Sequence, residues 1–185
     1  MNYQKMELKN AYKLINTLPV LLISTRNKKD ICNIAPIAWC SPAKKEPPRI
    51  VAGIGKVHKT YRNILETKEF IAGIPHISQV EILRKTGSVS GEKTDKFKEF
   101  KINYSTGTNT GCKIPNNMIG YLECKVGNIF DTGHLALVTG EVVHAEVASE
   151  AFDFNEKRLL CEKSAGKCIY HMGGGKFLAP GDEIH

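Results

Sequence analysis

Residues 33–42 read Asn-Ile-Ala-Pro-Ile-Ala-Trp-Cys-Ser-Pro, and the stretch from Asn33 to Asn63 that they open limits the folds available to the chain. Apolar residues alternate at Ile34, Pro36 and Ala38, which is the period of a β-strand. Pro36 has no backbone N–H group, so this strand is expected at a sheet edge or in an irregular loop. The small residues around 38–41 would let a flat ligand approach the backbone, whose N–H groups can bind anions or carbonyls. An ordinary strand, loop and strand ending in a proline-rich turn explains the same pattern without a ligand.

The composition is that of an ordinary soluble globular protein, with 42% hydrophobic and 24% charged residues. A chain of 185 residues is expected to form one domain, residues 1–185, with a sizeable core. No apolar run approaches the roughly 18 residues that span a bilayer. The N-terminus mixes both charge signs and has no apolar segment typical of a signal peptide. We therefore expect a cytoplasmic protein that does not enter a membrane.

The charge balance is basic, with a net charge of +7 and an isoelectric point near 9.1. Such a balance raises the possibility of nucleic-acid binding. The lysines are scattered among glutamates, however, and do not form a stripe along one face. This pattern is more typical of a solvated surface, and no nucleic-acid partner is expected.

The six cysteines include no Cys-x-x-Cys pair. In a chain without an export signal they are most simply reduced thiols, several of them buried as small apolar residues. The grouping Cys161-x6-Cys168-x2-His171 could suggest a metal site. Zinc sites normally show tighter paired spacing and four ligands, so no metal site is expected.

Short β-rich runs separated by turns predict a mainly β protein. The predicted strands cover residues 20–25, 31–34, 49–55, 69–74, 121–126, 135–147 and 168–172. Gly140 predicts a β-bulge within the sixth of these. Residues 101–117 are expected to form a long loop, and the charged stretch 156–163 a surface helix or a partner-facing excursion. Hairpin spacing favours an antiparallel β-barrel with small inserted helices over an alternating β/α sheet.

The inserted helices have recognisable start signals. Thr60 suits the N-cap position of a first helix. Ser78 and Glu81 have the spacing of a capping box, and the helix that they open is expected to stop at Gly87. Residues 94–95 can cap a third, short helix.

Eight motifs follow one another in a characteristic order. They are Leu-Pro-Val-Leu-Leu-Ile-Ser-Thr at 18–25, Asn-x-Ala-x-x-x-Trp at 33–39, Pro47-Pro48, Thr-Tyr-x-Asn-Ile at 60–64, Phe70, Ser-Gly-Glu-Lys-Thr-Asp-Lys-Phe at 90–97, Leu-Glu-Cys at 122–124 and His-x-x-Leu-x-x-Gly-Glu-Val at 134–142. Together they resemble the flavin reductase-like family of FMN-binding split barrels, most closely its flavoredoxin branch. The resemblance is strongest over residues 15–147 and weaker at 170–177. It implies an FMN-binding split barrel and a homodimer with FMN near the subunit interface.

The resemblance assigns a phosphate cradle to residues that also suit it chemically. A helix N-terminus at Thr60 would offer a hydroxyl, backbone N–H groups and the positive end of the helix dipole. Lys59 adjoins it, and Lys96 would add charge from a second direction. The other implied FMN contacts here are Asn63, Ser90 and Thr94. Without the resemblance, Thr60 would be a plain helix cap and Lys96 a solvated surface lysine.

The resemblance also assigns residues to the side of the site that would run from the FMN phosphate to the flavin ring. The residues concerned are Asn33, Ala35, Pro36, Ala38, Trp39 and Cys40. Trp39 could equally be a core residue, and Cys40 is expected to contribute backbone contacts without thiol chemistry. His134 matches a histidine that faces the flavin or its reductant, which makes it the candidate catalytic residue; a structural histidine in a strand is the alternative.

These implications lead to an FMN-dependent oxidoreductase. Electrons would pass from NADH, NADPH or a protein donor through FMN to a second flavin, a metal complex or a small protein. The alternative is a non-enzymatic electron carrier that shuttles electrons between partner proteins. No dinucleotide-binding fingerprint is present, so the choice between NADH and NADPH stays open.

Overall fold

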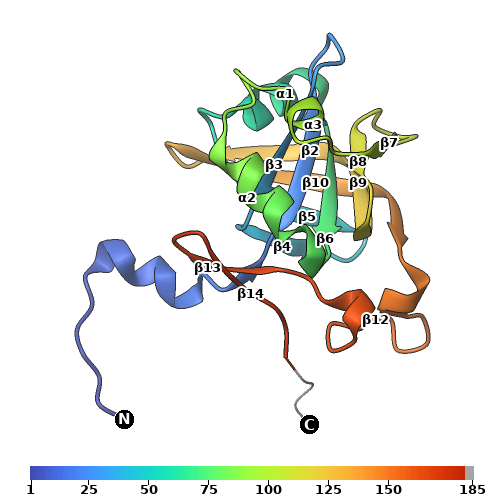
Figure 1. Ribbon diagram of the computed structural model, residues 1–185. Helices are drawn as coiled ribbons and strands as arrows, with labels where there is room; N and C mark the ends of the chain where they lie inside the picture. Colours follow the sequence, from blue (N-terminus) through green and yellow to red (C-terminus); the bar gives the residue numbers. More distant parts are fainter. Residues whose placement is uncertain (182–185) are drawn as a thin grey trace.

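A curved antiparallel sheet of seven strands dominates the computed structural model, which describes residues 1–181 (Figure 1). In sheet order its strands are β3 (Cys32–Ile37), β2 (Leu21–Arg26), β6 (Glu69–Pro75), β9 (Met118–Asp131), β10 (Leu135–Val147), β5 (Arg49–Gly55) and β4 (Cys40–Lys44). The first and last strands of this order are consecutive in the chain and separated only by Ala38 and Trp39. The sheet therefore bends round so that its two ends meet, and the predicted mainly β architecture is confirmed.

The inside of the curved sheet holds the largest core. Its fully buried members come from the central strands and from the helix that caps one end, among them Ile23, Ile54, Ile64, Phe70 and Val138. Gly140 makes this packing possible, because a Cβ atom there would lie 2.4 Å from the Phe70 ring. The β9–β10 register shifts between Val138 and Gly140. The predicted bulge is therefore confirmed, and it lies where the sheet must pass close to a large core side chain.

Three α-helices lie beside β2 and β3: α1 (Lys59–Thr67), α2 (Val80–Ser88) and α3 (Lys96–Glu99) (Figure 1). The predicted cap at Thr60 is wrong. His58 is the last extended residue before α1, and Thr60 is the second residue inside the helix. The predicted cap of the third helix is confirmed, because the Asp95 carboxylate accepts hydrogen bonds from the N–H groups of Phe97 and Lys98.

The predicted start and stop of α2 are also wrong. The reciprocal cap is made by His76 and Gln79 around a 3-10 turn, Ile77–Gln79, and α2 begins only after that turn. Gly87 lies within the helix and does not end it. A Cβ atom on Gly87 would lie 3.1 Å from Pro36 Cγ, so this glycine allows α2 to pack closely on β3.

The remaining elements are short. They are β1 (Leu18–Pro19), β13 (Tyr170–Gly173) and β14 (Lys176–Leu178) in one small sheet, the pairs β7 (Tyr104–Thr106) with β8 (Lys113–Pro115) and β11 (Phe152–Asp153) with β12 (Arg158–Leu159), and 3-10 helices at Leu8–Ile15, Ser149–Ala151 and Ser164–Gly166.

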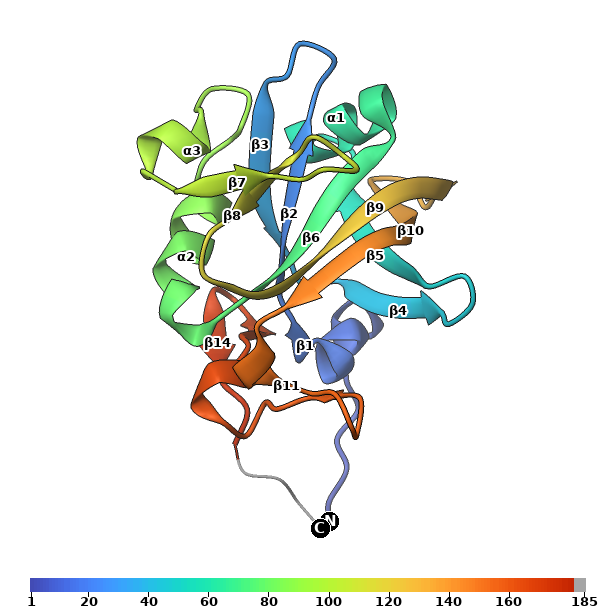
Figure 2. The same cartoon turned by 90° about the vertical axis from the view of Figure 1, so that its right-hand side faces the viewer.

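Residues 101–117 thus contain a hairpin where a plain loop was expected. Residues 156–163 form turns and β12, so the helix expected there is wrong. Figure 2 shows this C-terminal segment packed beneath the barrel. Within residues 1–181, no helix is long and apolar enough to cross a membrane.

Candidate functional site

A cavity of about 360 Å³ opens between β3, the start of α1, the end of α2 and the loop that leads to α3. Seven of the residues predicted from the sequence line it: Asn33, Ala35, Pro36, Lys59, Thr60, Ser90 and Lys96. They come from three segments of the chain, of which the first and the last are more than fifty residues apart. The volume falls within the range of small-molecule sites in proteins.

The edge position of β3 provides one wall of the cavity. Strand β3 pairs only with β2 in the sheet, as Pro36 requires, because proline cannot donate a ladder hydrogen bond. The prediction of an edge strand is therefore confirmed. The loop after α2 covers this wall closely. A Cβ atom on Gly91 would lie 1.9 Å from Asn33 Oδ1, so only glycine fits at that position.

Asn33 and Thr60 form a buried polar pair at the floor of the cavity. Asn33 Nδ2 donates to Thr60 Oγ1 at 2.9 Å, and both residues are almost fully buried. Because the threonine oxygen accepts this bond, its own hydrogen remains available to a ligand. Asn33 Oδ1 is buried without a hydrogen-bond partner among residues 1–181. The floor thus offers one donor and one acceptor, and buried polar atoms normally have partners.

Two lysines bring positive charge to the same cavity. Lys96 is only 4% exposed, and its ammonium donates to the Thr86 carbonyl at the end of α2. Lys59 Nζ donates to the Gly91 carbonyl at 3.0 Å. Burial, and then the neighbouring charge of Lys59, lowers the pKa of Lys96 to about 8. The residues that line the cavity include no aspartate or glutamate. Within the part of the chain that the structure describes, these two cations therefore face a space without a carboxylate to balance them.

The start of α1 reinforces the positive potential. The helix has nine residues and begins at Lys59, so its first N–H groups and the positive end of its dipole lie beside the Thr60 hydroxyl. Two ammonium groups, a hydroxyl and a helix N-terminus together form a site for an anion.

Trp39 and Cys40, which the sequence placed on the ring side, lie outside the cavity. Trp39 is 45% exposed, its Nε1 donates to Asn16 Oδ1 at 2.9 Å, and its ring meets Tyr12 edge to face. Cys40 belongs to the core inside the sheet, and burial raises the pKa of its thiol to about 12. Ala38 lines an adjoining, apolar cavity of about 400 Å³ that shares Pro36, Gly87 and Ser88 with the first.

Three further predicted residues are also absent from the cavity wall. Asn63 is buried behind it, where its Nδ2 donates to Thr25 Oγ1 at 3.1 Å. Thr94 lines a neighbouring open hollow. His134 is exposed in the turn between β9 and β10, outside any strand, and its carbonyl accepts a hydrogen bond from the backbone of Lys56 at 3.0 Å. The proposed catalytic histidine therefore does not reach this cavity within the single chain.

Sequence reasoning missed one whole wall. Thr86, Gly87, Ser88 and Val89 at the end of α2 line the cavity, together with Ile37, His58 and Gly91. Gly91 lies inside the motif at 90–97 and His58 lies two residues before the motif at 60–64, so adjacency could have suggested them. The end of α2 carries no motif, and only its packing on β3 brings it to the site.

Comparison with known proteins agrees with this geometry. Residues 15–162 match the family described as flavin reductase like domain. The chain is 28% identical over 186 residues to protein YddH of Escherichia coli (strain K12), which covers 96% of this chain and 95% of that protein.

Two solved structures share the fold. Flavoredoxin of Desulfovibrio vulgaris (Miyazaki F) has a TM-score of 0.85 at 21% identity, covering 100% of this chain and 96% of that one. An FMN-binding protein from Thermus thermophilus has a TM-score of 0.85 at 19% identity, covering 100% and 98%. The predicted fold class, a flavin reductase-like split barrel, is confirmed. With the family match extending over 15–162, the chain belongs to the flavin reductase-like family.

Proposed function

We propose that the cavity binds FMN through its phosphate and that the protein is an FMN-dependent oxidoreductase of the flavin reductase and flavoredoxin type. The observation that carries the proposal is the buried Lys96 ammonium, which faces the cavity together with Lys59 and without a carboxylate. A buried cation is costly unless it is compensated. A phosphate dianion supplies that compensation.

The residues present fit FMN in their chemistry as well as in their charge. Lys59, Lys96 and the Thr60 hydroxyl would hold the phosphate through charge-assisted hydrogen bonds. The unpartnered Asn33 Oδ1 can accept a hydrogen bond from a hydroxyl of the ribityl chain.

The protein's part in the reaction is to bind and orient the cofactor. FMN, when bound, supplies the hydride and electron chemistry. The proposed donor is NADH, NADPH or a redox protein, and the proposed acceptor is a flavin, a metal complex or a protein. The family and the FMN-binding structural relative support an oxidoreductase of this kind. His134 stays a prediction for a catalytic role; on this proposal it would act only from a second subunit or after a movement of its turn.

A homodimer in the cytoplasm forms part of the same proposal. The 3-10 helix Leu8–Ile15 exposes apolar side chains such as Leu14 and Ile15, at 75% and 77%. Exposed apolar surface of this kind favours a protein partner, and a second copy of the chain would cover it. Light scattering should give twice 20.5 kDa.

A non-enzymatic FMN electron carrier is the second candidate, favoured by the similarity to a flavoredoxin. The two candidates differ in turnover. An enzyme oxidises NADH or NADPH in steady state with free FMN as acceptor, whereas a carrier does so only when its partner proteins are present.

The phosphate contacts can be tested by comparing FMN with riboflavin, which lacks the phosphate. Charge-assisted hydrogen bonds contribute about 1.5–3 kcal/mol each, so Lys96→Ala or Thr60→Ala should weaken FMN binding about tenfold to a hundredfold. Riboflavin binding should hardly change. Titration calorimetry of both ligands measures this.

Lys98→Ala is the matched control, because Lys98 lies on α3 with Lys96 but is exposed and does not line the cavity. It should bind both ligands as the unmodified protein does. Equal weakening of FMN and riboflavin by Lys96→Ala, or no weakening of either, contradicts the phosphate assignment.

A further inference from the structure

A pair of thiols lies away from the cavity, in the segment that follows β12. Cys161 Sγ and Cys168 Sγ are 3.9 Å apart, on either side of the 3-10 helix Ser164–Gly166. Cys161 is half-buried, whereas Cys168 is 4% exposed. Cys161 is therefore the more exposed residue of the pair. Neither residue lines the proposed FMN cavity.

The backbone between the two cysteines is held in place. Lys163 N donates to Leu160 O at 3.0 Å, and Gly166 N donates to Lys163 O at 3.1 Å. A Cβ atom on Gly166 would lie 2.1 Å from Leu160 O, so only glycine permits this tight turn. The turn is tied to the barrel, because Ile77 N donates to Lys167 O at 2.9 Å. These contacts keep the two sulfurs facing each other.

The other four cysteines lack this arrangement. Cys40, Cys112 and Cys124 are buried, and burial raises the pKa of each thiol to about 12. Cys32 is half-buried like Cys161, but its sulfur lies 3.7 Å from the Asp30 carbonyl and contacts no second sulfur. Across residues 1–181, Cys161 and Cys168 are the only cysteines whose sulfurs are in contact.

We propose that Cys161 and Cys168 form a thiol–disulfide exchange site that reacts with low-molecular-weight disulfides. In the first step the Cys161 thiolate attacks one sulfur of the small disulfide, whose S–S bond breaks and releases one thiolate. In the second step Cys168 gives its proton to solvent and attacks Cys161 Sγ, which releases the second small thiolate and forms the intrachain disulfide. The two protein thiols are oxidised by two electrons, and the small disulfide is reduced to two thiols.

The surroundings assign the order of the two steps. Cys161 is the more exposed residue of the pair and therefore attacks first, while Cys168 resolves the mixed disulfide. Burial raises the pKa of the Cys168 thiol, so the second step should be the slower one at neutral pH and should accelerate as pH rises.

The reaction can be tested on the reduced, full-length protein with oxidised glutathione, both before and after loading with FMN. Two of the six thiols should be lost under non-denaturing conditions, and reduction should restore them. Peptide mapping by mass spectrometry should find Cys161 joined to Cys168 within one chain. No loss of thiols, or a disulfide that joins other cysteines such as Cys32 and Cys112, would overturn the assignment.

Single variants separate the roles of the two thiols. Cys168→Ser should stop at a glutathione adduct on Cys161, and Cys161→Ser should leave Cys168 unmodified. Cys32→Ser is the matched control, since Cys32 is also half-buried, and it should still form the Cys161–Cys168 disulfide. An adduct on Cys168 in the Cys161→Ser variant would contradict the proposed order.

Discussion

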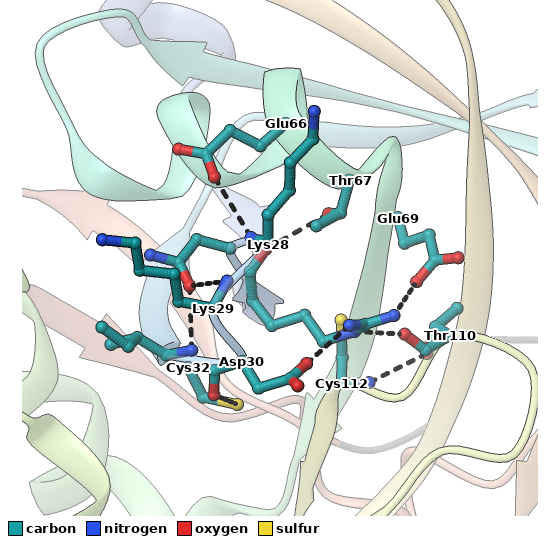
Figure 3. Close-up of polar contacts among 12 residues, drawn as sticks. Lys28, Lys29, Asp30, Cys32, Glu66, Thr67, Glu69, Thr110 and Cys112 are labelled. Carbon is teal, nitrogen blue, oxygen red and sulfur yellow. Dashed lines mark hydrogen bonds and ion pairs between the residues drawn. The ribbon is translucent and has the colours of Figure 1, made fainter.

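Arg26 and Lys96 are two shielded cations beside the same β2–β3 hairpin, and their charges are balanced in different ways. The Arg26 guanidinium donates to Asp30 Oδ1 at 2.7 Å, to Glu69 Oε2 at 3.2 Å and to the Thr110 carbonyl at 2.9 Å (Figure 3). Among residues 1–181 the Lys96 ammonium has a carbonyl partner but no carboxylate, and the pKa of Lys96 is lowered by burial. Arg26, whose charge is paired, has a pKa raised by its carboxylate partners despite burial.

This difference separates a structural cation from a binding cation. The charge of Arg26 is balanced within the chain by Asp30 and Glu69. The contacts of Arg26 also tie β2 to β6 and to the loop before β8. Among residues 1–181 no carboxylate lines the cavity around Lys96, and on the proposed function an anionic ligand supplies the complementary charge. Burial of a charge without a partner destabilises a fold, so such a lysine is expected where binding requires it.

A carboxylate placed in the Lys96 cavity should give it the paired charges of the Arg26 cluster. Of the changes considered, this one should have the largest effect, and the effect is on FMN binding. Ser90→Asp would put a negative charge beside the two lysines, where it would pair with them and repel a phosphate. Like-charge contacts cost several kcal/mol, so we expect FMN binding to weaken about a thousandfold. Fluorescence titration measures this. Ser90→Asn, similar in shape but neutral, should retain binding; equal loss in both variants would mean that shape, and not charge, matters at this position.

Removal of the charge at Lys96 should stabilise the protein in the absence of ligand. The folded-state pKa of Lys96 is lowered to about 8 from 10.5, so the unfolded chain binds this proton more tightly. The loss of stability caused by the protonated Lys96 is fully present below pH 8 and disappears as the pH rises towards 10.5. The free energy of unfolding of Lys96→Met should therefore be about 3 kcal/mol higher than that of the unmodified protein at pH 7, and the two should be equal near pH 10.5.

Denaturant unfolding of the two proteins across this pH range measures the difference. Because other groups titrate in both proteins, only the difference between them is informative. A Lys96→Met variant that is less stable at pH 7 would show that the lysine is already compensated within the chain.

Removal of a carboxylate from the Arg26 cluster should lower the stability of the protein, and by less than Lys96→Met raises it. Glu69 also accepts from Lys125, and its side chain is 15% exposed. Glu69→Gln should lower the free energy of unfolding by about 2 kcal/mol and leave FMN binding unchanged. Glu92→Gln, which removes an exposed pair with Arg62, is the control and should cost less than about 1 kcal/mol. Loss of FMN binding in Glu69→Gln would contradict the separation of the two regions.

The fold was largely predictable because strands carry their signals locally. Pro36 lacks an N–H and lies on an edge strand, and Gly140 marks the bulge beside Phe70. Helix starts were less predictable. Thr60 has the chemistry of a cap, but its hydroxyl accepts a hydrogen bond from Asn33 on strand β3. The helix begins at Lys59, one residue before Thr60. A cap signal cannot reveal a competing partner that is distant in sequence.

The site was predictable only in part for a related reason. Lys96 lies in a motif that carries the family resemblance and Lys59 adjoins another, and both reach the cavity. Trp39 ends an equally strong motif and Cys40 follows it, yet Cys40 lies in the core inside the sheet and Trp39 packs outside it onto Tyr12. Thr86 was missed because its contribution comes from the packing of a helix end and from no motif of its own.

The pKa of Lys96 measured with and without FMN tests the central claim most directly. Heteronuclear NMR of the lysine side-chain methylene next to the ammonium can follow this titration, with Lys96→Met used to assign the signal. The account predicts a pKa of about 8 in the free protein, a value raised above 10 when FMN is bound, and no change with riboflavin. An ordinary pKa in the free protein, or a pKa that FMN leaves unchanged, would contradict the claim that this lysine binds the phosphate.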